Sequence, residues 1–357
     1  MLPSDQNRHR AQRFSPTVWL HYTIDVIPEQ YRPSLSHVIS RTFLNLAMLS
    51  DYRSQTIDAA LLDDLSHLVR LAIREDLDRT ADLTTMAIVP QGVQGSAVIL
   101  PRVAGFAAGV DLIEAILQEL DARITWTQHL GDGEPFQPRQ KLATLAGDSR
   151  DLLTCERTIL NFLGRLCGIA TLTNRFVSKI QGTKARVYDT RKTTPGWRRL
   201  EKYAVRCGGG RNHRLGLFDG ILIKDNHLAC RAAKDGKLLD PGTAVQAAKM
   251  FLSSGAYRFE SPPMIEIEID RTSQLESAIG ALPDIVLLDN MSCDQLRECV
   301  AIRDRLAPSV ELEASGGVNL DTIGNIALTG VDRISVGALT HSAINLDLGL
   351  DWVLHHE

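Results

Sequence analysis

Aromatic side chains and an excess of positive charge are both missing from this sequence. Only 5% of its 357 residues are aromatic, and its formal net charge at pH 7 is −4. Proteins that bind nucleic acid usually carry a basic excess and, for single strands, aromatic side chains on which the bases stack. These values argue against a nucleic-acid partner. Any anion site in this chain must be a local cluster of cations.

Closely spaced cysteines and long apolar runs are absent as well. The smallest gap between any two of the six cysteines is six residues, from Cys293 to Cys299. A structural zinc site or a disulfide framework is therefore not expected, and the thiols should be reduced. No apolar run approaches the ~18 residues of a membrane span, and the N-terminal residues lack the apolar core of a signal peptide. We expect a cytoplasmic protein that does not bind a membrane.

The apolar pattern sets the first part of the chain apart from the second. Residues 1–55 show no sustained periodicity, and we expect a poorly ordered N-terminal extension. The alternatives are an upstream choice of start codon, since Met48 precedes the first clear helix, and a docking arm for a partner. From residue 56, apolar residues recur at helical spacing. Residues 56–168 predict an α+β domain, with strands at 95–109 and 141–146 and with helices at 112–120 and 152–177, the last interrupted at 168–170.

From residue 186 onward, six short β-rich segments alternate with helix-like stretches at 272–282, 292–306 and 319–328. Strands that alternate with helices predict a parallel sheet. Repeated β-α units of this kind fit a barrel, which here has fewer than the eight units of a complete one. We therefore predict an α/β fold in which residues 169–339 form an incomplete, TIM-like α/β barrel and residues 340–357 pack back on the first domain.

Almost every predicted barrel strand ends in residues that can carry chemistry. Barrel enzymes build their active sites at the carboxyl ends of the strands. A single such residue is more often a solvated loop charge, but six strand ends in succession predict an active site. In chain order these residues are Asp189, Arg191 and Lys192; Lys224, Asp225 and His227; Glu266, Glu268 and Asp270; Asp289 and Asn290; Ser315, Gly316 and Gly317; and Gly337.

The last two strand ends predict a phosphate site. Gly316-Gly317 and Gly337 each follow a strand and precede a helix, the first of which should begin near Asn319. Backbone amides at such turns and the helix N-terminus attract anions, and the final units of a barrel often bind phosphate. His341 could reach the same anion. The alternative is two ordinary glycine turns and a surface histidine.

Acidic residues alternate with isoleucines along the strand MIEIEID. Glu266, Glu268 and Asp270 share one face of it. Together with Asp289 they could hold ribose hydroxyls and a magnesium ion, which prefers oxygen ligands. The alternative is salt bridging to the barrel's own Arg and Lys residues. That reading carries more weight for Glu266 and Asp270 than for the other two acids.

Basic residues cluster between positions 191 and 224, which suggests a polyanionic ligand in a chain of negative net charge. Arginine is suited to bidentate contacts with carboxylate or phosphate. The run CGGGRNHR, residues 207–214, could form a loop that closes over the ligand; a flexible surface loop is the alternative. The basic residues are Arg191, Lys192, Arg198, Arg199, His213, Arg214 and Lys224.

Long runs of the sequence resemble the quinolinate phosphoribosyltransferase family, also called nicotinate-nucleotide pyrophosphorylase (carboxylating). The resemblance covers about residues 57–354, and its most specific part is 188–227. The sequence departs from the family pattern in the 1–55 extension, in an expanded stretch at 228–263, at Cys167 (commonly serine) and at Ala81 (commonly glycine). The matching runs are EDLDRTADLTT, CERTILNFLGRLCGIATLT, YDTRKTTPGWR, EKYAVRCGGGRNHR, ILIKDNH, IEIEID, VLLDN, EASGGV and SVGALTHS.

The resemblance implies an N-terminal α+β sandwich domain, an incomplete barrel, and a homodimer or larger assembly with shared active sites. It implies that quinolinate and phosphoribosyl pyrophosphate react, with Mg²⁺, to give nicotinate mononucleotide, pyrophosphate and CO₂ in de novo NAD biosynthesis. The rivals are a sister phosphoribosyltransferase with another substrate and a non-catalytic nucleotide-binding protein. The complete set of Arg, Lys and His residues favours the dicarboxylate substrate.

The resemblance also implies roles for individual residues. Arg157 is the arginine donated across the subunit interface. Glu268 and Asp289 hold the ribose and the magnesium side, and together with Lys192 and Lys224 they are the expected catalytic residues. Quinolinate and phosphate binding falls to Thr190, Arg191, Lys192, His213, Arg214 and Lys224, and the 5′-phosphate to Ser315, Gly316, Gly317, Gly337 and His341.

Overall fold

The computed structural model describes residues 51–353, except 237, 256 and 260, and in helix α6 it describes side chains only up to Cys230. Most of the expected N-terminal extension lies outside these residues. Within its last five residues, 51–55, Tyr52 and Gln55 are buried. The expected extension is therefore too long at this end. None of the helices in the described ranges is apolar over enough residues to cross a bilayer.

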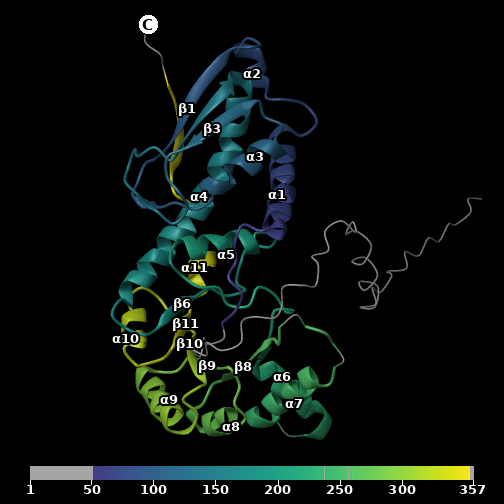
Figure 1. Ribbon diagram of the computed structural model, residues 1–357, viewed down its shortest axis with the longest axis vertical. Helices are drawn as coiled ribbons and strands as arrows, with labels where there is room; N and C mark the ends of the chain where they lie inside the picture. Colours follow the sequence, from purple (N-terminus) through teal and green to yellow (C-terminus); the bar gives the residue numbers. More distant parts are fainter. Residues whose placement is uncertain (1–50, 237, 256, 260, 354–357) are drawn as a thin grey trace, which may run out of the picture. The chain divides into compact units, whose positions relative to one another are not determined.

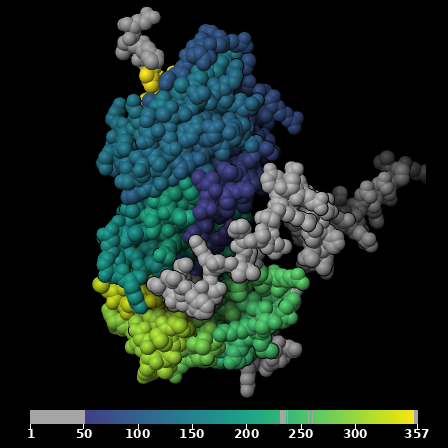
Figure 2. Space-filling model, viewed as in Figure 1, coloured from purple at the N-terminus to yellow at the C-terminus, as the bar shows by residue number. Residues whose placement is uncertain are grey.

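The first layer is a four-stranded antiparallel sheet in the order β12-β1-β5-β3, covered by helices (Figure 1). Strand β12, at the end of the chain, pairs with β1, and its yellow residues lie against blue ones in Figure 2. The predicted helical spacing holds for α1, whose Leu61, Leu65 and Val69 are fully buried. The elements of this layer are α1 (Ala59–Leu77), α2 (Leu83–Ile88), β1 (Gln94–Pro101), β2 (Gly105–Phe106), a 3-10 turn (Val110–Leu112), α3 (Ile113–Glu119), β3 (Ile124–Gln128), β4 (Pro135–Phe136), β5 (Ala143–Asp148), α4 (Ser149–Lys179) and β12 (Leu348–Trp352).

The second layer is a six-stranded, all-parallel sheet in the order β6-β11-β10-β9-β8-β7. The first strand, β6, pairs with the last, β11, as in a barrel, but within the described ranges β6 and β7 do not pair with each other. The predicted incomplete barrel is confirmed. Its elements are β6 (Arg186–Tyr188), α5 (Arg198–Cys207), β7 (Gly220–Ile223), α6 (Asp225–Asp235), α7 (Pro241–Ser253), β8 (Met264–Ile269), a 3-10 turn (Thr272–Gln274), α8 (Leu275–Gly280), β9 (Ile285–Asp289), α9 (Cys293–Leu306), β10 (Glu311–Ser315), α10 (Ile323–Ala327), β11 (Arg333–Ser335) and α11 (Ala338–His341).

Helix α4 is continuous, so the expected interruption at 168–170 is wrong. The glycines serve the close approach of another part of the chain. A Cβ on Gly168 would lie 1.9 Å from the backbone oxygen of Ile344, and one on Gly164 would lie 2.9 Å from that of Leu346. The Leu346 N–H donates to the Gly164 carbonyl at 2.9 Å. The returning C-terminal chain thus rests directly on α4, which crosses the expected domain boundary at 168.

The segment 207–214 is neither a closing loop nor a flexible surface loop. A Cβ on Gly208 would lie 2.3 Å from the Ala170 oxygen of α4, so this turn is packed tightly against the helix. The Arg211 N–H donates to Val187 at 2.8 Å, and the Asp189 N–H donates to the Arg211 carbonyl at 3.0 Å. The segment therefore lies beside β6 like a short additional strand, on the open side of the barrel.

A buried ion pair holds this segment in place. Lys202 of α5 is fully buried, and its Nζ contacts the Asp189 carboxylate and donates to the His213 carbonyl at 2.9 Å. Asp189 also accepts the His213 N–H at 2.9 Å and the Asn212 side-chain amide at 2.7 Å. Burial lowers the pKa of Lys202 even though Asp189 opposes this. One carboxylate at the end of β6 therefore fixes the backbone that enters the candidate site.

Gly168→Ala should lower the free energy of unfolding by about 1–3 kcal/mol, because the new methyl group meets backbone that can yield only by moving a packed chain. Gly280→Ala is the matched control, since a Cβ there meets nothing within 4 Å; it should be neutral or stabilising by about 0.4–1 kcal/mol. Urea unfolding measures both. Equal effects would contradict the proposed close approach.

Lys202→Met should lower the free energy of unfolding by about 3–5 kcal/mol, because it leaves the buried Asp189 carboxylate without its cation. Lys184→Met is the comparison: its Nζ contacts Asp332 at 2.7 Å, but the side chain is half exposed, so the loss should stay below about 1 kcal/mol. Thermal and urea unfolding distinguish the two. A small loss for Lys202→Met would show that Asp189 is not held in this way.

Candidate active site

The carboxyl ends of the barrel strands surround a cavity of about 640 Å³. Most of the predicted site residues line it, although they come from five different strand ends. Of the residues to which the family resemblance assigns a role, Arg157, Gly337 and His341 do not line it. The lining residues are Thr190, Arg191, Lys192, His213, Arg214, Leu222, Lys224, Glu268, Leu287, Asp289, Asn290, Glu313, Ser315, Gly316, Gly317 and Ser335.

Cations without carboxylate partners form one side of this cavity. The Arg191 Nε is buried and finds no hydrogen-bond partner in the described part of the chain. Arg214 is buried as well, and its Nη1 donates to the Gly220 carbonyl at 3.2 Å. Burial and the neighbouring Arg191 lower the pKa of Arg214, although the guanidinium stays charged. Buried donors of this kind are unfavourable unless an anion completes them, so this side of the cavity is suited to a carboxylate or phosphate.

Acidic side chains from β8 and β9 form another side of the cavity. Glu268 pairs with Lys224, and Asp289 accepts a hydrogen bond from the Asn290 amide at 2.9 Å. Of the three acids expected on one face of β8, only Glu268 lines the cavity. Asp270 lies past the end of the strand and pairs with Arg271 in solvent, and Glu266 lies deeper in the barrel. The salt-bridge alternative is thus correct for Asp270, and it also describes the Glu268 pair.

His213 and Glu313 form the floor of the cavity, and Glu266 lies beneath them in the same buried cluster. The His213 Nε2 lies 2.9 Å from Glu266 Oε2 and 3.5 Å from Glu313 Oε1, and its Nδ1 accepts the Arg214 N–H at 2.8 Å. Burial lowers the pKa of His213, but the two carboxylates outweigh it, so the net shift is upward. Burial and the charge of Glu266 raise the pKa of Glu313. Sequence reasoning missed Glu313, although its position two residues before Ser315 places both on one face of β10.

The glycines form an adjoining cavity of about 290 Å³ that also contains Lys192 and His341. Gly316 has φ 93°, and a Cβ there would lie 2.2 Å from the Asn290 side chain. Gly317 also has positive φ, so successive backbone amides can face one anion. The helix expected near Asn319 begins only at Ile323 and is five residues long. A helix dipole therefore adds little here, and the backbone amides remain.

Two of the clustered arginines, Arg198 and Arg199, make contacts within the protein and do not line the cavity. Arg199 pairs with Asp64 of α1 at 2.7 Å, and the Arg198 Nε donates to the Thr193 hydroxyl at 3.0 Å. The expectation that they contact the polyanion is wrong. Their spacing in sequence places them on a helix that follows the site.

Arg157 is exposed on α4, 3.9 Å from Glu156, and lines a different hollow together with Asp82 and Thr154.

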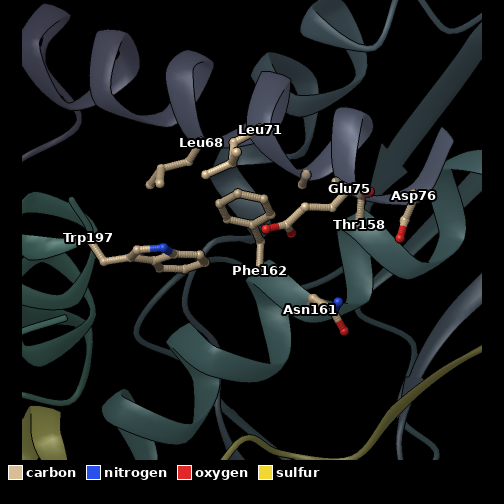
Figure 3. Close-up of a pocket in the computed structure, with 9 residues that line it drawn as sticks. Leu68, Leu71, Glu75, Asp76, Thr158, Asn161, Phe162 and Trp197 are labelled. Atoms are coloured by element: carbon tan, nitrogen blue, oxygen red, sulfur yellow. The ribbon is translucent and has the colours of Figure 1, made fainter. Parts of the chain in front are cut away.

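A smaller cavity of about 190 Å³ between α1 and α4 is shown in Figure 3. Phe162 and Trp197 stack in it with centroids 4.8 Å apart, and Glu75 and Asp76 edge it. The described residues that line it include no Lys or Arg. It is a poor anion site, so the barrel cavity is the candidate active site.

Comparisons with known proteins show which family the chain resembles. Two family models match the chain: "Quinolinate phosphoribosyl transferase, N-terminal domain" over residues 82–167 and "Quinolinate phosphoribosyl transferase, C-terminal domain" over residues 169–351. The chain is 44% identical over 287 residues to the nicotinate-nucleotide pyrophosphorylase (carboxylating) of Mycobacterium leprae. The aligned residues cover 79% of this chain and 95% of that protein. It is 38% identical over 295 residues to the probable nicotinate-nucleotide pyrophosphorylase (carboxylating) of Bacillus subtilis, covering 82% and 95%.

Solved structures show the same similarity. The nicotinate-nucleotide pyrophosphorylase from Francisella tularensis superposes with a TM-score of 0.74 at 36% identity, over 85% of this chain and 100% of that one. The enzyme of the same name from Ehrlichia chaffeensis gives a TM-score of 0.70 at 35% identity, over 81% and 98%. With both parts matched by family models and relatives of this identity, the chain belongs to the quinolinate phosphoribosyltransferase family.

Proposed function

We propose that the chain converts quinolinate and phosphoribosyl pyrophosphate to nicotinate mononucleotide, pyrophosphate and CO₂, a step of de novo NAD biosynthesis. The observation that carries this proposal is a single cavity in which Arg191 and Arg214 have no carboxylate partner in the described part of the chain on one side, with the Arg191 Nε buried and unpartnered, and carboxylates stand on another side. A pyridine dicarboxylate needs the first side, and a ribose with its phosphates needs the second and the glycine loops. Relatives named for this activity cover most of the chain.

Quinolinate binding is assigned to the cationic side. Its two carboxylates would be met by Arg191 and Arg214, with Lys192 and Lys224 at the cavity edge, Thr190 beside them and His213 at the floor. Neutralising both carboxylates lets the ring nitrogen approach the sugar. Holding the two substrates in line converts a bimolecular reaction into a nearly unimolecular one.

The sugar diphosphate is assigned to the acidic side and to the glycine loops. Glu268 and Asp289 are oxygen donors in the cavity, and they fit a Mg²⁺ ion that is carried mainly by substrate phosphates. Bound there, the ion would neutralise charge on the departing pyrophosphate. The 5′-phosphate is assigned to the second cavity, with the backbone amides near Ser315, Gly316, Gly317 and Gly337 and the imidazole of His341.

The order of the two chemical changes follows from the ring. Bond formation between the ring nitrogen and the anomeric carbon makes a pyridinium. Only this positive ring stabilises the carbanion left when the adjacent carboxylate departs as CO₂, and that carbon then takes up a proton to give nicotinate mononucleotide. Lys192 and Lys224, which line the cavity, are the side chains assigned to charge stabilisation during both steps.

We also propose a homodimer, or a larger assembly built from it, in which Arg157 reaches the partner's cavity. Its exposure on α4, away from its own cavity, supports this.

The lack of a long apolar helix in the described ranges and the unpaired cysteines there fit a cytoplasmic enzyme.

Purified protein with quinolinate, phosphoribosyl pyrophosphate and Mg²⁺ should release nicotinate mononucleotide and an equal amount of CO₂, detected by chromatography and ¹⁴CO₂ capture. EDTA should abolish turnover. Nicotinate in place of quinolinate is the control and should yield no CO₂. No product across pH 6–9, or a preference for nicotinate, would disprove the assignment.

Mixing Arg157→Ala with Lys224→Ala should restore activity that neither variant has alone, because a mixed dimer contains one cavity with both cations. Random exchange gives half of the dimers this arrangement, so about a quarter of all cavities should regain activity. Lys249→Ala, an exposed change on α7, serves as the active control. No recovery after subunit exchange is verified by mass spectrometry would rule out a shared site.

A further inference from the structure

We propose that Tyr52 is a positioning residue for the active site, acting through Glu266, His213 and Gly220 to hold Arg214 in place. The inference rests on the proposed function in that Arg214 is assigned to the dicarboxylate. Tyr52 lies outside the cavity, in the segment that precedes α1.

The segment 51–52 lies at the amino ends of the barrel strands. Asp51 accepts hydrogen bonds from Arg333 at 3.0 Å, from Arg211 at 2.9 Å and from the Tyr188 hydroxyl at 2.9 Å. Tyr188 and Arg333 belong to β6 and β11, and Arg211 lies alongside β6. A Cβ on Gly220, the first residue of β7, would lie 2.8 Å from the Tyr52 ring. Tyr52 also forms a buried cluster with Met264 and Ile285, the first residues of β8 and β9, so it lies under the barrel at the amino ends of its strands.

A chain of hydrogen bonds leads from Tyr52 to the backbone of Arg214. The Tyr52 hydroxyl donates to Glu266 Oε2 at 2.6 Å, and the same carboxylate oxygen lies 2.9 Å from His213 Nε2. His213 Nδ1 accepts the Arg214 N–H at 2.8 Å. A nitrogen that accepts carries no proton, so in this arrangement the proton is on Nε2. Both ring nitrogens are engaged with the protein, and His213 acts on a ligand through Arg214.

A second path runs through ring packing. The Tyr52 ring stacks on His213 with centroids 4.6 Å apart and an interplanar angle of 29°. It also packs against Gly220, whose carbonyl accepts from Arg214 Nη1 at 3.2 Å. Tyr52 thus supports both the backbone and the guanidinium of Arg214. A shift of the ring would move both ends of a side chain assigned to the substrate carboxylate.

The same cluster has a metal-site alternative, because ligand atoms of His213, Glu266 and Glu313 lie within 4.8 Å of one another. Three of the four carboxylate oxygens are already used: Tyr52 donates to Glu266 Oε2, the His213 Nε2 lies 3.2 Å from Glu266 Oε1, and the Arg333 Nε donates to Glu313 Oε2 at 2.8 Å, which leaves only Glu313 Oε1 without a hydrogen-bond partner in the described part of the chain. A buried guanidinium beside the cluster disfavours a further divalent charge. The hydrogen-bonded chain is therefore the better interpretation.

Tyr52→Phe keeps the ring and removes the hydroxyl. It should raise KM for quinolinate about tenfold, because a hydrogen bond to a buried carboxylate is lost, with KM for phosphoribosyl pyrophosphate and kcat within about twofold. Tyr203→Phe is the matched control. Its hydroxyl also donates to a carboxylate, Asp132, at 2.6 Å, and it does not line the cavity. Tyr203→Phe should lower Tm by about as much as Tyr52→Phe does and should leave both KM values unchanged. Glu266→Gln, which keeps the tyrosine, is the second variant and should show the same selective rise.

¹⁵N NMR of His213, assigned with His213→Gln, gives a reading that does not depend on turnover. Wild type should show the Nε2–H tautomer, and Tyr52→Phe should shift the Nε2 resonance. If the wild type is active and Tyr52→Phe has the same KM values as Tyr203→Phe, this inference is wrong while the proposed function stands. Wild type without product would refute the proposed function, while the NMR would still test the chain. If adding Zn²⁺ to EDTA-treated Tyr52→Phe restored its KM for quinolinate, the cluster would be a metal site and the inference would again be wrong.

Discussion

The buried carboxylate of Asp189 is the interaction on which the site depends. It ends strand β6 and holds Lys202, the Asn212 amide and the His213 backbone at once. A charge removed from water is tolerated only when its oxygens are all engaged. Because they are, the backbone that carries His213 and Arg214 has one position. Arg214 can therefore stay in place without a carboxylate partner of its own.

Charges inside the barrel follow two different rules. Below the cavity floor, Arg333 is fully buried and contacts Asp51, Glu311 and Glu313, so its charge is compensated within the protein. Above the floor, the Arg191 Nε is buried and unpartnered in the part of the chain that the structure describes. The compensated charge of Arg333 gives a rigid base below the floor. The unpartnered donor of Arg191 can form a hydrogen bond with an anion that enters the cavity. The floor between them separates structural from ligand-binding charge.

Much of this could be read from the sequence, because strand period and strand order place polar residues at one end of a parallel sheet. That reasoning located Lys192, Lys224 and Glu268 correctly in one cavity. It failed where depth or close approach decides: Glu266 shares a face with Glu268 yet lies under the floor, and Gly168 reads as a helix break although it serves packing against residue 344. Periodicity gives the face of an element but not its neighbour.

The N-terminal segment shows the same limit more sharply. Tyr52 has no periodic neighbours, so its sequence context predicts only an irregular extension. Its role follows from tertiary contacts: Tyr52 packs with Met264 and Ile285 at the amino ends of β8 and β9. From there its flat ring stacks on the imidazole of His213, and its hydroxyl donates to Glu266. A residue from outside the barrel strands thus supports the base of the candidate active site.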